Sequence, residues 1–435
     1  MNLYDELETR GILKQVTSPK LRDAMNGGSL TLYCGFDPTS DTLHVGSLLP
    51  LLTLKRFQQA GHKVIAVVGG ATGMIGDPSF KAQERTLLTE ELLAANVRGI
   101  RSVIEKLLPL KGATAARVMN NYEWTSPFSF IHFLRDVGKH FTINYMMAKE
   151  SGRARREDRE HGISYTEFSY MLLQAYDFQH LHEKFGCQLQ IGGSDQWGNI
   201  TAGTELIRRM KAHAQGREST DQDEEHAFGL THPLVMKADG TKFGKTESGT
   251  IWLSAEKTSP YQFYQFWIQT TDADISTYLR FFSFKSLDEI AQLEEATKTR
   301  PEKREAQQAL AREMVELTHG KDALAAADEA TAILFGGDPT KASSAALREV
   351  QSSIPNWELP LSRLQSGITL IEALAESGLS PSKGQARKDI EGGGISVNNQ
   401  KITDIAFALK PEQRLAGEFI LLRKGKKNYL LVHLK

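Results

Sequence analysis

The chain has 435 residues, of which 40% are hydrophobic, and a formal net charge of -1. This length predicts two or three domains, because single cores rarely grow beyond about 250 to 300 residues. The two cysteines lie far apart and outside any CxxC pair, which argues against a disulfide framework and a structural zinc site and favours the reducing cytoplasm.

The N-terminal segment mixes charged and apolar residues. Residues 1–16 contain no unbroken apolar run, so they predict an amphipathic helix and not a signal peptide. No segment of the sequence is apolar over a length that would span a membrane, and we expect no membrane contact.

Apolar runs in the first half of the chain predict a parallel sheet. Residues 31–34 read as a strand that enters a glycine turn, and residues 48–57 have the apolar density of a buried helix. Residues 64–68 form a second run rich in β-branched side chains. Such runs are typical of strands covered on both faces, which requires helical crossovers. Shorter runs at residues 117–119 and 188–191 predict further strands.

These patterns predict an α/β protein of several parts. We expect a doubly wound, Rossmann-like domain over residues 1–230, with a helical insertion near 126–161. Helical spacing then predicts an all-helical domain within 231–335. Residues 336–366 are rich in Gly, Ser and Pro and predict a linker, and residues 367–435 predict a small α/β tail. The acidic segment 214–226 suggests a surface excursion without an assigned function.

The first chemical motif is His44-Val45-Gly46-Ser47, where a strand-derived loop meets a helix. Helix N-termini accept phosphate charge through free backbone N–H groups and the helix dipole. Gly46 lets an adenine ring approach the backbone, and the imidazole of His44 can donate to a phosphate oxygen. The alternative is a simple helix cap, with Ser47 at the helix start.

The second motif is Lys242-Phe243-Gly244-Lys245-Thr246, which follows a predicted strand at residues 233–236. Two lysines beside a glycine suit a flexible clamp on pyrophosphate. Gly240 precedes Gly244 by three intervening residues, whereas a P-loop needs four, so a P-loop ATPase is excluded. The alternative is an exposed basic loop.

Two further stretches carry polar groups at informative spacings. Tyr170, Gln174 and Asp177 share one helix face among apolar neighbours, which indicates either the wet side of the helix or the wall of a polar pocket. In residues 190–199, Asp195 is positioned to accept from ribose hydroxyls and Gln196 to touch a polar substrate end, although plain helix capping is the alternative.

A glycine-rich stretch at residues 69–78 follows the second predicted strand. Its glycines miss the dinucleotide spacing, so NAD binding is not expected. Beyond it, Lys81 and Arg85 form an i, i+4 cation pair. Such a pair is usually surface solvation, but near a triphosphate it would add positive charge.

Together these motifs resemble the class I aminoacyl-tRNA synthetases, and within them the bacterial tyrosine-specific branch, over essentially the whole chain. The His-x-Gly-His signature matches at His44 and Gly46, with Ser47 in place of the second histidine. The Lys-Met-Ser-Lys-Ser signature matches at residues 242–246. The strings YCGFDPT, GGATGMIGDPS, FSYMLLQAYD and GGSDQWGN are similar to those of the tyrosine enzymes.

The resemblance implies activation of L-tyrosine with ATP and transfer of tyrosine to tRNA(Tyr). Tyr33 and Asp177 would hydrogen-bond the phenol of tyrosine. Asp77, Tyr170 and Gln174 would hold its α-ammonium group. The implied tyrosine-binding set also includes Gln196, near the carboxylate, and Asn121, which lies with Trp124 behind the residues that touch tyrosine.

The resemblance also implies an ATP site, with ATP entering as its Mg²⁺ complex and no metal of the protein's own. Cys34 and Asp37 would lie beside adenosine, and Thr39 would meet the γ-phosphate or pyrophosphate. The implied ATP-binding set is Cys34, Gly35, Asp37, His44, Gly46, Ser47, Gly193, Asp195 and Lys245. The implied catalytic set is Thr39, His44, Lys81, Arg85, Lys242, Lys245 and Thr246.

The tail resembles an S4 RNA-binding module at residues 382–388 and 392–398. From Ser366 onward the chain carries 11 Lys and Arg against 7 Asp and Glu, and basic side chains suit phosphate contacts. The resemblance further implies that the helical domain within 231–335 binds the anticodon, and that two chains form a homodimer joined through residues 128–145. The predicted RNA-binding residues are Lys383, Arg387, Lys388, Arg423, Lys424, Lys426 and Lys427.

Three rival functions fit parts of the sequence. A tryptophan-specific synthetase shares the signatures but has no use for a pair of residues that reads a phenol. A nucleotidyltransferase of the His-x-Gly-His type does not need the helical and RNA-binding parts. An RNA binder tethered by an S4 module would have lost the chemistry altogether.

Overall fold

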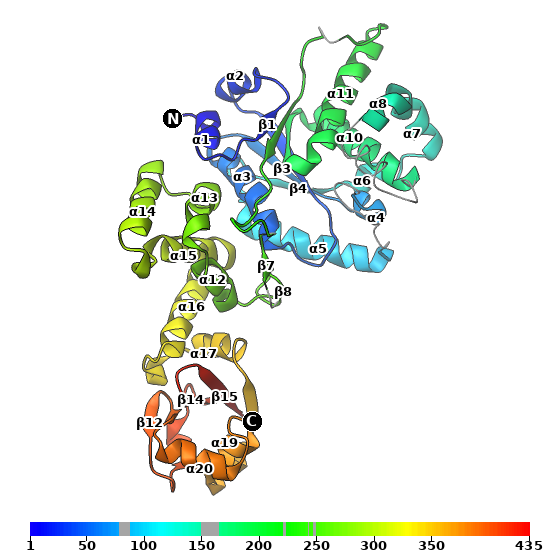
Figure 1. Cartoon of the computed structure of the whole chain (residues 1–435). Coiled ribbons are helices and arrows are strands. Elements are labelled where there is room, and N and C mark those ends of the chain that lie inside the picture. Colours follow the sequence, from blue (N-terminus) through cyan, green and yellow to red (C-terminus); the bar gives the residue numbers. More distant parts are fainter. Residues whose placement is uncertain (78–87, 149–164, 221–222, 242, 247–248) are drawn as a thin grey trace. The chain divides into compact units, whose positions relative to one another are not determined.

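The computed structural model describes residues 1–77, 88–148, 165–220, 223–241, 243–246 and 249–435 (Figure 1). The chain forms two compact units. The first consists of Met1–Ser254 and Asp272–Glu295, and the second of Ala255–Thr271 and Ala296–Lys435. The predicted domain boundaries at residues 230, 335 and 366 stay predictions.

A six-stranded sheet forms the centre of the first unit, with strand order β1-β6-β5-β2-β3-β4. Strands β2 to β6 pair in parallel, and the short β1 is antiparallel to β6. This topology confirms the predicted doubly wound fold. The order reverses between β2 and β5, where such sheets bind ligands at their carboxyl ends. The strands are β1 (Gln15–Val16), β2 (Thr31–Phe36), β3 (Lys63–Val68), β4 (Arg117–Asn120), β5 (Cys187–Gly193) and β6 (Phe228–His232).

Burial of the strands explains why their apolar runs can be recognised in the sequence. Residues 64–68 of β3 and all of β6 are buried, as expected for strands covered on both faces. The chain leaves the sheet at Pro233, although residues 233–236 had suggested a strand. Proline has no N–H to donate to a sheet ladder, so the strand ends one residue earlier, at His232.

Helices and short turns surround this sheet (Figure 1). The amphipathic helix expected over residues 1–16 is shorter than predicted, because Gln15 and Val16 already pair with β6. The elements of the first unit are α1 (Leu3–Thr9), α2 (Leu21–Asn26), η1 (Val45–Ser47), α3 (Leu48–Gln59), α4 (Thr72–Ile75), α5 (Glu90–Leu107), α6 (Tyr122–Thr125), α7 (Phe130–Asp136), η2 (Gly138–His140), α8 (Ile143–Ala148), α10 (Tyr165–Phe185), η3 (Ser194–Gln196), α11 (Trp197–Ala214), β7 (Lys245–Thr246), β8 (Gly249–Thr250) and α13 (Asp272–Phe282), with α14 (Leu287–Thr299) at its edge.

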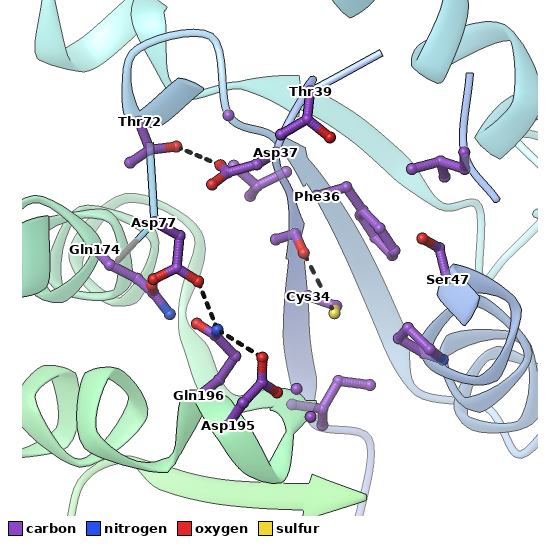
Figure 2. A pocket seen from close by; sticks show the side chains of 18 of the residues that line it. Cys34, Phe36, Asp37, Thr39, Ser47, Thr72, Asp77, Gln174, Asp195 and Gln196 are labelled. Atoms are coloured by element: carbon purple, nitrogen blue, oxygen red, sulfur yellow. Dashed lines mark hydrogen bonds between the residues drawn. The ribbon is translucent and has the colours of Figure 1, made fainter. Parts of the chain in front are cut away.

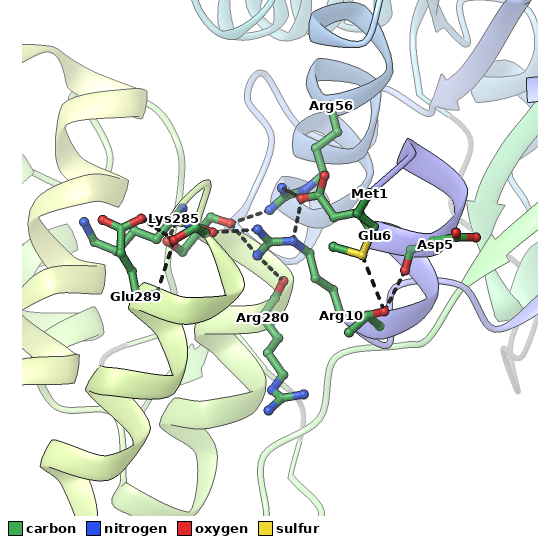
Figure 3. Close-up of polar contacts among 11 residues, drawn as sticks. Met1, Asp5, Glu6, Arg10, Arg56, Arg280, Lys285 and Glu289 are labelled. Carbon is green, nitrogen blue, oxygen red and sulfur yellow. Dashed lines mark hydrogen bonds and ion pairs between the residues drawn. The ribbon is translucent and has the colours of Figure 1, made fainter. Parts of the chain in front are cut away.

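A polar cluster ties α13 to α1 and α3 (Figure 3). Arg10 and Arg56 are 3% and 5% exposed, and both pair with Glu6, at 2.7 and 3.3 Å. Both also donate to the carbonyl oxygen of Ser283, at 3.1 and 2.5 Å. The last carbonyls of a helix lack partners within the helix. Two arginine side chains therefore supply hydrogen-bond donors to a backbone carbonyl oxygen where α13 ends.

The second unit begins with helices and ends with a small α/β part. Its elements are α12 (Pro260–Ile268), η4 (Pro301–Lys303), α15 (Glu305–His319), α16 (Lys321–Leu334), η5 (Pro339–Lys341), α17 (Ser344–Gln351), β9 (Asn356–Leu359), α18 (Leu361–Ser366), β10 (Ile368–Thr369), α19 (Leu370–Glu376), α20 (Lys383–Glu391), β11 (Ile395–Val397), β12 (Gln400–Ile402), β13 (Ala408–Leu409), η6 (Pro411–Gln413), β14 (Phe419–Lys424) and β15 (Asn428–Leu434). Five strands form a sheet in the order β12-β11-β14-β15-β9.

The segment predicted as a linker contributes structure to this unit. Strand β9 pairs in parallel with β15, and Leu347 and Val350 of α17 are buried in a cluster with Phe419 and Leu431. The buried residues of α17 recur at helical spacing, but the Gly, Ser and Pro residues of the segment had favoured a linker. No helix among the described residues is long and apolar enough to cross a membrane.

Candidate active site

A pocket opens at the carboxyl ends of β2 and β5, where the strand order reverses. It gathers residues from β2, η1, α10, η3 and the end of β6 (Figure 2). The predicted residues that the structure brings together in its wall are Tyr33, Cys34, Gly35, Asp37, Thr39, His44, Gly46, Ser47, Asp77, Asn121, Tyr170, Gln174, Asp177, Gly193, Asp195 and Gln196.

One end of the pocket holds a buried carboxyl group. Asp177 is 4% exposed and accepts hydrogen bonds from Nδ2 of Asn121 at 2.9 Å and Nε1 of Trp124 at 2.7 Å. Burial raises the pKa of Asp177 to about 7, although the two donors act to lower it. The polar stripe on α10 therefore faces a pocket and is not the wet side of a helix.

The hydroxyl group of Tyr33 lies in the same wall. Its oxygen is shielded from water and has no hydrogen-bond partner among the residues that the structure describes. Burial, and then the charge of Asp177, raises the pKa of Tyr33 well above its usual value. A buried hydroxyl without a partner is costly, and a ligand with a polar group at this point would relieve that cost.

Two groups of hydrogen bonds line the pocket wall, and Figure 2 shows the bond from Thr72 to Asp37 and those that Gln196 makes. Tyr170 donates from its hydroxyl to Asp37 at 2.8 Å, and Asp37 also accepts from Thr72 at 2.9 Å. Gln196 donates from Nε2 to Asp77 at 2.7 Å and to Asp195 at 3.3 Å. Asp37, assigned to adenosine, thus lies between the two predicted subsites. Tyr170 and Gln174, which shares its helix face, belong to α10.

Carboxylates and a thiol occupy the part assigned to the nucleoside. Burial raises the pKa of Asp195, against the lowering effect of the hydrogen bond from Gln196. Burial, and then the charge of Asp195, raises the pKa of Cys34 to about 12. Cys34 is therefore protonated at neutral pH, and its side chain forms a small apolar part of the pocket wall.

The His44 motif forms a capped turn at the pocket mouth. Nδ1 of His44 accepts a hydrogen bond from the backbone N–H of Gly46 at 2.9 Å, so the proton of the neutral imidazole lies on Nε2. Ser47 precedes α3 without a side-chain capping bond. Capping by Ser47 therefore does not explain this motif, whereas a donor at Nε2 of His44 suits a phosphate oxygen.

The second signature joins the first through backbone hydrogen bonds. The N–H of Ile251 donates to Gly244 at 3.1 Å, and the N–H of Val45 donates to Ile251 at 2.9 Å. Phe243 is 7% exposed, and its ring lies 5.0 Å from that of Tyr278 in α13. The two signatures are therefore parts of one site.

The predicted phosphate-binding cations are described only in part. Lys81, Arg85 and Lys242 lie outside the described residues. Lys245 and Thr246 form β7, which pairs with β8. Their predicted roles stay predictions.

Reasoning from the sequence missed several pocket residues, among them Thr72, His232 and Trp252. His232 and Trp252 lie in the wall, and the only signal for His232 was its position at the end of a strand. The apolar run at residues 233–236 predicts a strand there, and this prediction hides the fact that β6 ends at His232. Trp252 forms an isolated bridge with His44.

The basic residues of the tail differ in their partners. Arg387 and Lys388 are exposed on α20. Lys383 pairs with Glu372 at 3.2 Å and Lys424 with Asp389 at 2.6 Å. Arg423 lies over the ring of Tyr429, and Lys426 and Lys427 are exposed in the turn before β15.

Comparisons with known proteins identify the family of the chain. The family of class I tRNA synthetases (W and Y) matches residues 25–336, and a tyrosine–tRNA ligase SYY-like C-terminal domain matches residues 347–432. The chain is 52% identical to a tyrosine–tRNA ligase of Bacillus caldotenax, over 99% of both chains. It is also 52% identical to one of Chromobacterium violaceum, over 99% of this chain and 98% of that one.

Solved structures show the same likeness. A C-terminally truncated mitochondrial tyrosyl-tRNA synthetase of Aspergillus nidulans is 31% identical, with a TM-score of 0.68, and covers 76% of this chain and 93% of its own. The corresponding Coccidioides posadasii structure is 29% identical, with a TM-score of 0.65, over 75% of this chain and 91% of its own. The predicted family is thereby confirmed, and the chain belongs to the class I tRNA synthetases of the W and Y group.

Proposed function

We propose that the chain is a tyrosine–tRNA ligase that activates L-tyrosine with ATP and transfers it to tRNA(Tyr). The observation that carries this proposal is the pair formed by Tyr33 and Asp177 in one pocket wall. Asp177 supplies an acceptor for a phenol O–H, and the hydroxyl of Tyr33 lacks a partner among the described residues. The curated relatives with about half of their residues identical carry the same name.

The first step is an in-line displacement at phosphorus. A carboxylate oxygen of tyrosine bonds to the α-phosphorus of ATP, the bond from that phosphorus to the bridging oxygen breaks, and pyrophosphate leaves. The carboxylate is already ionised, so no general base is required. In the second step a hydroxyl of the terminal adenosine of tRNA attacks the carbonyl carbon, and AMP leaves. Mg²⁺ enters as part of the ATP substrate.

Catalysis of the first step then depends on positioning and charge stabilisation. The turn at His44 supplies the Nε2 donor, and the helix dipole at the start of α3 favours negative charge. Lys242 and Lys245 are proposed to hold the departing pyrophosphate, together with Lys81 and Arg85. Removing Lys245 should lower the rate of adenylate formation far more than tyrosine affinity.

Exchange of labelled pyrophosphate into ATP tests this function directly. We expect exchange that depends on L-tyrosine and that tryptophan does not support. Exchange driven by tryptophan would instead support the tryptophan-specific alternative. Exchange without any amino acid would indicate a nucleotidyltransferase, and no exchange alongside tRNA binding would leave an RNA binder without chemistry.

The tail is proposed to hold tRNA through its exposed cations. Lys388 is exposed on α20, and each phosphate contact adds to affinity in a salt-dependent way. Lys388→Gln should raise the KM for tRNA(Tyr) and leave pyrophosphate exchange unchanged. Lys63→Gln, which removes an exposed lysine from β3, is the matched control. Equal effects of both changes on the KM for tRNA would contradict the proposal.

A homodimer is proposed through α7 and α8. Phe130 and Ile131 are 63% and 70% exposed, and Ile143 is 63% exposed, which is unusual for large apolar side chains of a monomer. A second copy would cover them. Ile131→Glu should shift the chain towards monomer in sedimentation equilibrium, whereas Leu110→Glu, at another exposed apolar position, should not. We place the enzyme in the cytoplasm, where its thiols stay reduced.

A further inference from the structure

His232 lies in the pocket wall at a position with no assigned role. It ends β6 and pairs with Gly193 of β5, and paired residues of neighbouring strands project to the same face of a sheet. Gly193 belongs to the proposed ATP-binding set. The side chain of His232 is 5% exposed. A buried imidazole thus borders the part of the pocket that is proposed to hold the nucleotide.

The hydrogen bonding of His232 fixes what its second nitrogen can do. Nδ1 lies 3.4 Å from the carbonyl oxygen of Pro233. A carbonyl oxygen only accepts, so Nδ1 carries the proton, and in a neutral imidazole Nε2 is then an acceptor. Burial lowers the pKa of His232 to about 4, which keeps the ring neutral at pH 7.

Nε2 of His232 lacks a donor within the part of the chain that the structure describes. The atom is shielded from water and finds no hydrogen-bond partner among the described residues. Buried acceptors in native proteins are nearly always paired, and each exception calls for an explanation. At the edge of a ligand pocket, a donor on the ligand is such an explanation.

We propose that His232 determines nucleotide specificity, its Nε2 accepting a hydrogen bond from the exocyclic amino group of adenine. This inference rests on the proposed function, because it requires ATP in this pocket. Guanine carries a carbonyl oxygen at the same ring position, which would set two acceptors against each other. His232 therefore selects a purine with an amino group there.

The first test uses the unmodified enzyme and three triphosphates. Tyrosine-dependent pyrophosphate exchange is measured with ATP, with GTP and with purine riboside triphosphate, which lacks the amino group. We expect the KM for purine riboside triphosphate to exceed that for ATP by about five- to tenfold, the usual worth of one net hydrogen bond. Equal KM values for these two nucleotides would overturn the proposal.

The second test removes the acceptor. His232→Leu should raise the KM for ATP by about five- to tenfold and leave that for purine riboside triphosphate within about twofold. His62→Leu is the matched control, because His62 is also buried and its Nδ1 accepts from the N–H of Leu30, outside the pocket wall. An equal rise for both nucleotides would show that His232 acts only through packing and would refute the proposal.

The two proposals fail in different ways. Calorimetric titration of the unmodified enzyme with ATP and purine riboside triphosphate reads the same affinity ratio without any chemistry. A fivefold preference for ATP without tyrosine-dependent exchange would support base recognition and reject the ligase function. Tyrosine-dependent exchange without a preference between the two nucleotides would support the ligase function and reject base recognition by His232. The outcome does not depend on whether His232→Leu folds.

Discussion

Gly244 lies directly against Val45, although the two residues belong to different signatures far apart in the chain. A Cβ atom on Gly244 would come within 2.5 Å of Cγ1 of Val45. The backbone of Gly244 also has a φ of 81°, which is unfavourable for residues with a side chain. The glycine of the second signature is therefore required by close contact with the first, and not only by flexibility.

Replacing this glycine should impair the reaction. Gly244→Ala forces apart the turn at Val45 and the segment before β7, and we expect adenylate formation to slow by at least about tenfold. Gly240→Ala is the control, because Gly240 has a φ of 80° but no atom within 4 Å of a built Cβ. Pre-steady-state measurement of tyrosyl-adenylate would contradict this prediction if both variants slowed equally.

Removing the hydroxyl of Tyr33 should have opposite effects on stability and specificity. The oxygen is buried without a partner among the described residues, so Tyr33→Phe should stabilise the ligand-free enzyme by about 1 kcal/mol. The same change removes a contact with the phenol and should lower the preference for tyrosine over phenylalanine by about tenfold. Denaturant unfolding and exchange kinetics measure the two effects. A loss of stability would show that the hydroxyl is already paired in the free enzyme.

Asp177 should make stability depend on pH. Burial raises the pKa of its carboxyl group from 3.8 to about 7, so the folded state holds a proton that the unfolded state has already lost at intermediate pH. The stabilising effect of this proton is complete below about pH 4 and is lost as the pH rises towards 7. The slope reaches at most about 1.4 kcal/mol per pH unit.

The variant Asp177→Asn isolates this effect. Its asparagine does not titrate, so the unfolding temperature of the variant relative to that of the parent should increase from pH 4 to pH 7 and then level off. The measurement is made without tyrosine, since a bound phenol changes the surroundings of the carboxyl group. A difference that stays constant across this range would mean that Asp177 is ionised throughout.

The ion pairs that Glu6, itself 30% exposed, makes with two buried arginines should matter for stability more than a pair with an exposed arginine. Arg56→Met leaves Glu6 and the carbonyl of Ser283 with fewer partners, and we expect a loss of about 3 kcal/mol or more in unfolding free energy. Arg101→Met removes a similar ion pair with Glu105, but Arg101 is 52% exposed, so its loss should stay within about 0.5 kcal/mol. Similar losses in both variants would refute the importance of burial.

The strands were readable from the sequence for a clear physical reason. Strand β3 of the central sheet is buried along residues 64–68, and its unbroken apolar run is the pattern expected for a strand covered on both faces. The polar stripe of Tyr170, Gln174 and Asp177 left two interpretations open, the wet side of a helix or a pocket wall, because polar groups among apolar neighbours need either water or partners. Local patterns of this kind depend only on residues close together in the sequence, so they can be recognised without the tertiary structure.

Other parts of the site depend on contacts that no local pattern records. The bond from Tyr170 to Asp37 and that from Trp124 to Asp177 join residues from different elements, so they follow only from the strand order. His232 was missed because Pro233 shifts the end of β6, and its unpaired Nε2 becomes visible only once the neighbouring atoms are placed. Strand order and side-chain pairing are therefore what the structure adds.

The burial of Cys34 and Cys187 has a consequence for how the protein meets oxidants. Both thiols are buried, and burial raises the pKa of each well above its usual value. Peroxides and alkylating reagents attack thiolates, and these are the chain's two cysteines. The pocket can therefore have a sulfur atom in its wall while the folded protein offers oxidants almost no thiolate to attack.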